Sequence, residues 1–96
     1  MKKEMVIKIL KGLENEVRQK YKANIRGVFG SFVRGDQDAK SDIDILVEFE
    51  EGANLFDFVG LSIFLEERFR FPVDIVPIDT IREEIKENIL KEAIFL

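Results

Sequence analysis

Residues 43–49 form an alternating pattern that constrains the fold of this chain more than any other feature. The odd positions are apolar and hold Ile43, Ile45, Val47 and Phe49. The even positions hold Asp44, Leu46 and Glu48. A period of two is typical of a β-strand that turns one face to a core. Asp42 and Asp44 are two positions apart, so both should point to the same side of this strand.

The chain before this strand has the pattern of a helix followed by another strand. Apolar side chains recur every four residues, which predicts an amphipathic helix through about residue 21: Met5, Ile9, Leu13 and Val17. The segment 24–30 is rich in β-branched and aromatic residues and is closed by Gly30. This composition predicts a short strand that ends in a tight turn.

The chain after the alternating strand predicts a helix, a strand and a second helix. Asn54 suits the N-cap of a helix through about Phe69, and the segment 71–78 suits a third strand. Asp79 or Thr80 can cap a last helix, whose apolar positions would be Ile81, Ile85, Ile89 and Ala93. The predicted order is α-β-(turn)-β-α-β-α. The expected class is α/β (α+β), with a small mixed β-sheet and helices packed on one face.

Length and composition narrow the range of functions. The chain has 96 residues, of which 46% are hydrophobic, and we expect one domain spanning residues 1–96. It has no run of about 18 apolar residues, so we expect a cytoplasmic protein without a membrane span. It contains neither cysteine nor histidine, which excludes disulfides, thiolate or imidazole zinc sites and histidine-dependent triads. Its net charge of −4 argues against long duplex nucleic acid as a partner.

The predicted topology brings three carboxylates together. Gly30 ends one strand and Asp42 opens the next, so these strands must be antiparallel if both residues flank one site. The following strand is reached through a helix, and such a crossover normally makes two strands parallel. Asp74, near the start of that strand, then becomes level with Asp42 and Asp44. Three carboxylates should therefore converge at one end of the sheet.

Clustered carboxylates repel one another and usually require a cation. Oxygen ligands favour Mg²⁺ or Mn²⁺, and two such ions about 3.5–4 Å apart can activate a hydroxyl and stabilise a leaving phosphate. Gly30 would let the backbone approach a phosphate, and Ser31 offers a hydroxyl and an N–H group to its oxygens. The pattern predicts a metal-dependent phosphoryl-transfer site.

Two further residues are nucleotide-binding candidates with alternative interpretations. Arg34 either binds a phosphate or pairs with Asp36 or Asp38 on the surface. Ser41 either contributes to nucleotide binding or is a capping hydroxyl of the loop.

The candidate residues fall in one spaced motif: "GSFVRG" at 30–35, "SDID" at 41–44 and "VDIV" at 73–76. This motif resembles the signature of the minimal nucleotidyltransferases in the DNA polymerase β superfamily. The resemblance implies the polymerase β-like fold, ATP or another NTP as donor, and two Mg²⁺ ions, with Mn²⁺ as a substitute. It assigns the metals to Asp42 and Asp44, a shared metal and deprotonation of the acceptor hydroxyl to Asp74, and the triphosphate to Gly30 and Ser31.

The acceptor should be small or should come with a partner, because larger members of the superfamily carry an extra domain for their acceptor and this chain has no room for one. The helix expected at about 55–69 is apolar on more sides than one core-facing stripe requires. It therefore either binds another chain, including a second copy in a homo-oligomer, or packs on two sides within a small domain. Stand-alone members of the family resemble antitoxins that transfer AMP from ATP to a tyrosine hydroxyl of a HEPN-domain toxin. The alternative is a non-catalytic antitoxin that neutralises its partner by binding alone.

Overall fold

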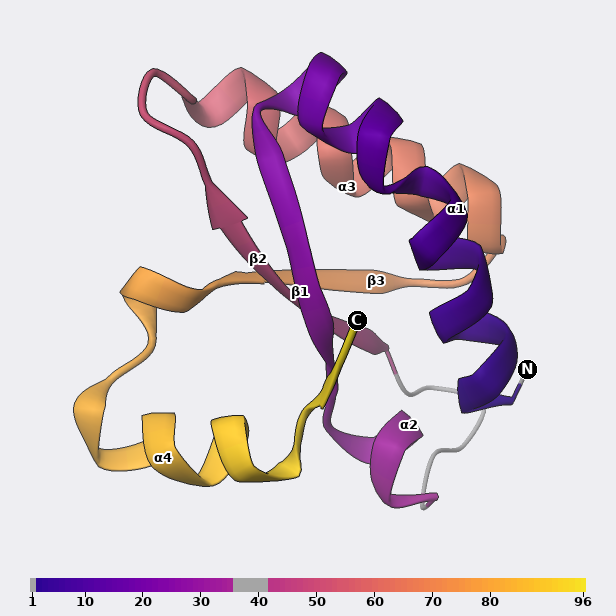
Figure 1. The fold of residues 1–96 in the computed structure, drawn as a ribbon, viewed down its shortest axis with the longest axis vertical. Coiled ribbons are helices and arrows are strands. Elements are labelled where there is room, and N and C mark those ends of the chain that lie inside the picture. The colour runs from indigo at the N-terminus through magenta and orange to yellow at the C-terminus, as the bar shows by residue number, and fades with distance from the viewer. Residues whose placement is uncertain (1, 36–41) are drawn as a thin grey trace.

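The computed structural model describes residues 2–35 and 42–96 (Figure 1). The chain forms, in order, α1 (Lys3–Tyr21), β1 (Ala23–Phe29), α2 (Ser31–Arg34), β2 (Ile43–Phe49), α3 (Leu55–Phe69), β3 (Val73–Pro77), the short 3₁₀ turn η1 (Ile78–Thr80), α4 (Glu83–Glu92) and β4 (Ile94–Phe95). The predicted class and the predicted order α-β-(turn)-β-α-β-α are confirmed, with α2 as the turn and with η1 inserted before the last helix. The strand at the C-terminal end was not predicted.

The four strands form one mixed sheet in the order β3-β2-β1-β4. As predicted, β1 and β2 are antiparallel, whereas β2 and β3 are parallel and joined through α3. Phe29 lies opposite Asp44 across the first pair, and Asp44 lies opposite Asp74 across the second. The end of β1, the start of β2 and the start of β3 therefore meet at one end of the sheet.

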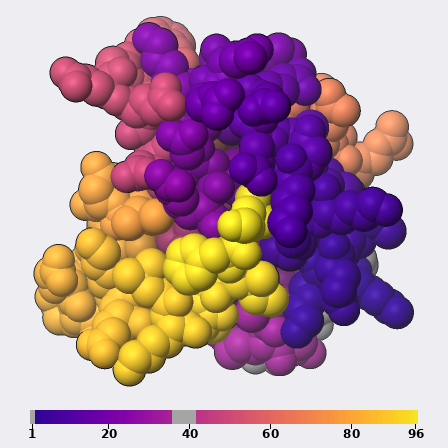
Figure 2. All heavy atoms as spheres, viewed as in Figure 1, coloured from indigo at the N-terminus to yellow at the C-terminus, as the bar shows by residue number. Residues whose placement is uncertain are grey.

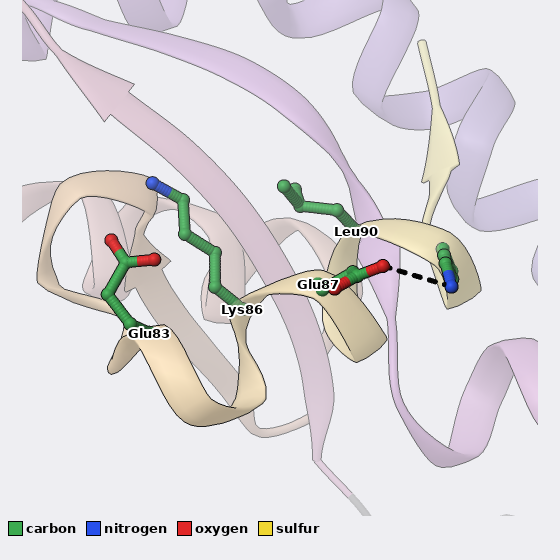
Figure 3. A pocket seen from close by; sticks show the side chains of 5 residues that line it. Glu83, Lys86, Glu87 and Leu90 are labelled. Atoms are coloured by element: carbon green, nitrogen blue, oxygen red, sulfur yellow. Dashed lines mark ion pairs between the residues drawn. The ribbon is translucent and has the colours of Figure 1, made fainter.

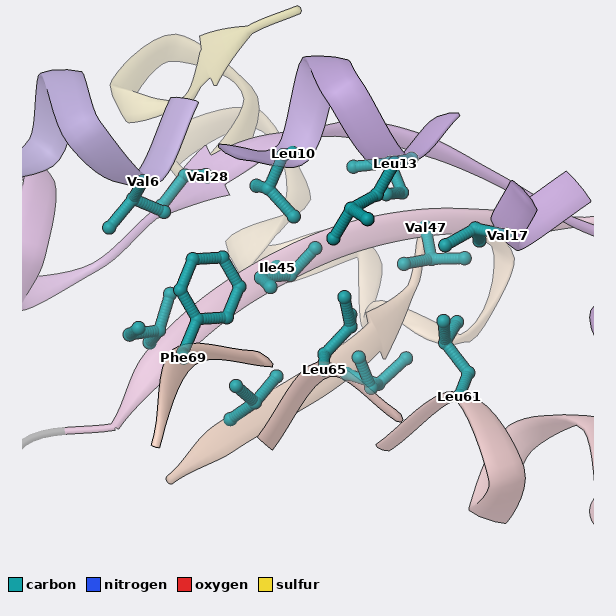
Figure 4. Close-up of a cluster of buried hydrophobic side chains, with 14 of the residues drawn as sticks. Val6, Leu10, Leu13, Val17, Val28, Ile45, Val47, Leu61, Leu65 and Phe69 are labelled. Carbon is teal, nitrogen blue, oxygen red and sulfur yellow. The ribbon is translucent and has the colours of Figure 1, made fainter. Parts of the chain in front are cut away.

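Helices α1 and α3 lie side by side over one face of the sheet, and the core fills the space beneath them (Figures 1 and 4). Its largest fully buried side chains come from both helices and from β2: Leu10, Leu61, Leu65, Ile43 and Ile45. Each such burial stabilises the fold by about 1.5–3 kcal/mol. Because odd positions of β2 face this core, Asp44 faces the opposite side of the sheet, away from α1 and α3.

Helix α1 is amphipathic, with four buried residues spaced along one side: Val6, Leu10, Leu13 and Val17. Its other sides carry charged residues that are exposed to solvent.

Across residues 2–35 and 42–96, no helix has both the length and the apolar character that crossing a bilayer requires.

The start of α3 is fixed by Asn54, as the sequence predicts. The Asn54 side-chain oxygen accepts hydrogen bonds from the backbone N–H groups of Phe56 at 2.9 Å and Asp57 at 3.2 Å. The Asp57 carboxylate accepts in return from the Asn54 N–H at 3.0 Å, which completes a capping box. Such a cap contributes about 1 kcal/mol to helix stability.

The prediction that Asp79 or Thr80 caps the last helix is wrong. Both residues belong to η1, and the Thr80 hydroxyl donates to the Pro77 carbonyl at 2.9 Å. This local bond uses the capping hydroxyl inside the turn, so the helix begins later. Helix α4 starts at Glu83 after Arg82, which provides no side-chain cap. Ile81, which we expected within the helix, precedes it.

The sequence interpretation also extended the last helix too far, to Ala93. Ala93 is extended, and β4 follows it and pairs with β1, with Val28 opposite Ile94. A Cβ atom at Gly27 would lie 2.5 Å from the Ile94 carbonyl oxygen. Glycine therefore permits the close approach of the two strands. The C-terminal segment 92–96 is too short to show a periodic pattern that would predict this long-range pairing.

Candidate active site

Asp44 lies at the centre of the candidate site. It is half-buried on β2, between Phe29 of β1 and Asp74 of β3 in the sheet register. Asp42 precedes β2 and is exposed, and Asp74 is exposed near the start of β3. The structure thus places the three predicted carboxylates on neighbouring strand ends, with Asp44 the least accessible to solvent.

Gly30 packs directly against the Asp44 carboxylate. Its φ of +84° lies in the left-handed region that favours glycine. A Cβ atom at this position would lie 2.1 Å from Oδ2 of Asp44 and 3.0 Å from its Cγ. Any other residue would displace the carboxylate or the turn that connects β1 to α2. Because Gly30 has no side chain, the Asp44 carboxylate can lie directly against the backbone of this turn.

The electrostatics of the site show a concentration of negative charge. The pKa of Asp44 is raised to about 6, chiefly by burial and then by the charges of Asp74 and Asp42, while Arg34 opposes the shift. Although Asp74 is exposed as a residue, partial desolvation of its carboxyl and, secondarily, the charge of Asp42 raise its pKa. The folded chain holds these carboxylates where their ionised forms are disfavoured, as expected for a site that attracts a cation.

The donor set fits a hard divalent cation shared with a ligand. Within residues 2–35 and 42–96, no three acidic side chains are arranged as a complete metal cage. Mg²⁺ does not require such a cage, because it is commonly held by one or two carboxylates together with substrate phosphates and water. Asp44 and Asp74, paired in register, provide carboxylates of this kind. The arrangement therefore favours a metal that binds together with a phosphate compound.

The turn after β1 carries the predicted phosphate-binding residues. Ser31 opens α2, and its carbonyl accepts the Gly35 N–H at 2.9 Å. Phe32 is buried and packs edge-on against Phe71 at 5.4 Å between ring centroids, which fixes α2 to the core. Ser41 lies outside the described residues.

Glu92 at the end of α4 is a site residue that the sequence interpretation missed. Its Oε1 atom accepts from the Gly30 N–H at 2.8 Å and from Nη1 of Arg34 at 2.7 Å. We had expected Arg34 to bind phosphate or to pair with Asp36 or Asp38, which lie outside the described residues. Glu92 is 62 positions from Gly30 in a charged helix, so no local pattern marks it.

A separate hollow lies along α4 and is unrelated to the carboxylates. It has a volume of about 430 Å³ and is lined by residues of this helix alone: Glu83, Lys86, Glu87, Leu90 and Lys91 (Figure 3). Glu87 and Lys91 pair across one turn at 3.1 Å. A groove lined by one helix with a single apolar residue lacks the enclosed apolar lining of a typical ligand pocket. This hollow is therefore a weaker candidate than the open site around Asp44.

Comparisons with known proteins agree with this geometry. A family model described as a nucleotidyltransferase domain matches residues 10–96. Protein adenylyltransferase MntA of Thermococcus cleftensis is 36% identical over 93 residues, which cover 97% of this chain and 94% of the relative. A Methanocaldococcus jannaschii protein provisionally named a protein adenylyltransferase is 46% identical over 67 residues, or 70% of this chain and 72% of the relative.

Solved structures give the same result. A protein provisionally named a minimal nucleotidyltransferase superposes with a TM-score of 0.81 at 35% identity, covering 100% of this chain and 97% of the other. A toxin-antitoxin structure with AMP-PNP shares the fold, with a TM-score of 0.70 at 22% identity over 99% of this chain and 72% of the other. The chain therefore belongs to the nucleotidyltransferase domain family, among the minimal nucleotidyltransferases.

Proposed function

We propose that this protein transfers AMP from ATP to a hydroxyl group of a partner protein. The observation that carries the proposal is the packing of the Asp44 carboxylate against Gly30, in register with Asp74. This arrangement joins a cation-attracting group to a backbone turn that can approach a phosphate. The relatives named as protein adenylyltransferases support the choice of nucleotide and of a protein acceptor.

Each residue has a role in the proposed reaction. Gly30 and Ser31 bind the triphosphate through the turn between β1 and α2, and Arg34 provides a positive charge beside it. Asp74 accepts the proton of the attacking hydroxyl, a role that its position in register with Asp44 supports. Pyrophosphate leaves as the nucleotide is transferred. Ser41 is a further nucleotide-binding candidate.

We assign the metals to the three aspartates. Asp42, Asp44 and Asp74 would hold two Mg²⁺ ions, for which Mn²⁺ can substitute. When bound, such ions neutralise phosphate charge and activate the attacking hydroxyl. The raised pKa of Asp44 supports this assignment, since a nearby cation would relieve the repulsion that raises it.

In this proposal the protein is a cytoplasmic antitoxin, and the acceptor of AMP is its partner toxin, a protein of the HEPN class. The toxin-antitoxin structures that share this fold support the pairing. Helix α3 supplies a surface for it, because four of its apolar side chains are well exposed: Leu55, Phe56, Val59 and Ile63. Phe56 is 87% exposed, which is unusual for an aromatic side chain without a partner. A homo-oligomer formed through the same helix is the competing use of this surface.

Labelled ATP distinguishes catalysis from binding. The wild-type chain, with Mg²⁺ and its partner, should transfer label from α-labelled ATP to the partner. Asp42→Asn and Asp44→Asn should abolish the transfer while the complex still forms in size-exclusion chromatography. Labelling by the double variant at the wild-type rate would contradict the proposed function.

The exposed surface of α3 favours one second candidate, a binding module that neutralises its partner without catalysis. This candidate predicts that both aspartate variants still neutralise the toxin fully. Complete loss of neutralisation in variants that still bind the partner would exclude it.

A further inference from the structure

Glu92 contacts the turn after β1, but the proposed reaction gives this residue no role. One carboxylate oxygen, Oε1, accepts from both the Gly30 N–H and the Arg34 guanidinium. Figure 2 shows the C-terminal segment lying across the molecule against the region of α2. A backbone N–H and a guanidinium held on one anionic oxygen are the same donors that a nucleotide phosphate would use.

The position of Glu92 is electrostatically unfavourable in one respect. Its contact with Gly30, which packs against Asp44, brings a further negative charge close to the three aspartates. A carboxylate that served only as an anchor would be expected to avoid a site already rich in negative charge. Its binding to Gly30 and Arg34 offsets this repulsion, which indicates that the two donors form an anion position of their own.

Helix α4 packs only loosely against the rest of the molecule that the structure describes. None of its ten residues is buried. Beyond it, β4 contributes only two residues to the sheet, paired with Gly27 and Val28. An element with so little burial separates from the fold at low free-energy cost. The contact of Glu92 with the turn can therefore open without unfolding of the core.

We propose that the Glu92 carboxylate occupies the position of a nucleotide phosphate and that a nucleotide must displace it to bind. This inference rests on the proposed function and adds to it an internal competitor for the anion position. The incoming phosphate takes over the Gly30 N–H and the Arg34 guanidinium, and the end of α4 moves away from the turn. The negative charge that Glu92 brings near Asp44 leaves with it.

The affinity for a non-hydrolysable ATP analogue with Mg²⁺ measures this competition. Glu92→Gln keeps the shape of the side chain and a neutral acceptor but removes the charge. We expect the Kd of the analogue to fall about fivefold, which corresponds to ~1 kcal/mol. Glu92→Ala, which removes the acceptor as well, should lower the Kd at least as much.

Glu87→Gln is the matched control, since it removes the same charge from the same helix. Glu87 pairs with Lys91, one turn further along the same helix, at 3.1 Å. The Kd of this variant should equal that of the wild type. An equal fall in both variants would show a general charge effect and overturn the inference.

Hydrogen exchange provides an independent readout. Saturating analogue should increase the exchange of α4 amides in the wild type, because the nucleotide releases the helix. A Kd for Glu92→Gln that is unchanged or higher, or α4 amides that become more protected on binding, would show that Glu92 is a structural anchor. If neither the wild type nor any Glu92 variant binds the analogue, the proposed function itself is wrong and the inference fails with it.

Discussion

Asp44→Asn should stabilise the metal-free protein. The rise of the Asp44 pKa from 3.8 to about 6 would correspond to ~3 kcal/mol if it acted fully against folding. Because the side chain is only half-buried, solvent screening reduces this, and we expect about 1 kcal/mol. Asparagine has nearly the same shape and can still pack against Gly30. For a domain of this size, 1 kcal/mol raises the Tm by about 4–8 °C.

The pH dependence gives the sign of the effect. The folded chain binds the Asp44 proton more tightly than the unfolded chain does, so the contribution of this group to stability is fully present below pH 3.8 and is lost as the pH rises through about 6. Thermal unfolding in EDTA should therefore show the gain from Asp44→Asn at pH 7.5 and little gain at pH 4.

Asp79→Asn serves as the control for that measurement, since it removes one negative charge from an exposed position on η1. Its Tm should change by less than 1 °C, because surface substitutions of this kind alter stability by at most about 0.5 kcal/mol. A Tm of Asp44→Asn equal to or below that of the wild type at pH 7.5 would refute the interpretation of Asp44 as a destabilised charge.

Three further perturbations test other parts of the site and surface. Mg²⁺ with an ATP analogue at ~100 times its Kd should stabilise the fold by about 2.7 kcal/mol, and EDTA should reverse this gain. Mg²⁺ alone should stabilise the fold much less, and equal effects with and without nucleotide would contradict a metal site shared with the nucleotide. Gly30→Ala should lower stability by about 1–3 kcal/mol and abolish transfer, because its Cβ would meet Oδ2 of Asp44, whereas wild-type transfer would contradict the packing described for this turn. Phe56→Glu should fold but lose complex formation in size-exclusion chromatography, and an intact complex would exclude this face of α3 as the interface. Phe64→Glu should unfold or lose about 2 kcal/mol of stability, because the Phe64 ring packs on that of Tyr21 with 5.5 Å between centroids.

The order of the main elements could be predicted because each carries its own local signal. The period-2 pattern of residues 43–49 and the cap at Asn54 depend only on neighbouring residues, and both are confirmed. The pairing of Asp44 with Asp74 followed from one topological rule, the parallel crossover through a helix. Short-range periodicity together with handedness was sufficient for this part of the fold.

The C-terminal part could not be predicted because its structure depends on distant residues. The strand β4 forms only because β1 offers Gly27 at the contact, and Glu92 reaches the site only because α4 turns back across the sheet. Each of these contacts joins residues more than 60 positions apart. The start of α4 failed for a local reason, since Thr80 bonds within η1 instead of capping a helix.

The aromatic residues of α3 show the limit of periodicity in another way. The sequence left open which of them faces outwards, and the structure exposes Phe56 while it partly buries Phe58 and Phe64. Helical spacing gives the angle between side chains, but the direction of the core is set by the sheet and by α1.

Parallel reactions with α-labelled and γ-labelled ATP distinguish adenylyl transfer from phosphoryl transfer. With Mg²⁺ and the partner protein, we expect label on the partner only from α-labelled ATP, label in pyrophosphate from γ-labelled ATP, and neither product with Asp44→Asn. Label on the partner from γ-labelled ATP would instead show phosphoryl transfer. That result, or undiminished transfer by Asp44→Asn, would contradict the assignment of Asp44 and its neighbours to adenylyl transfer.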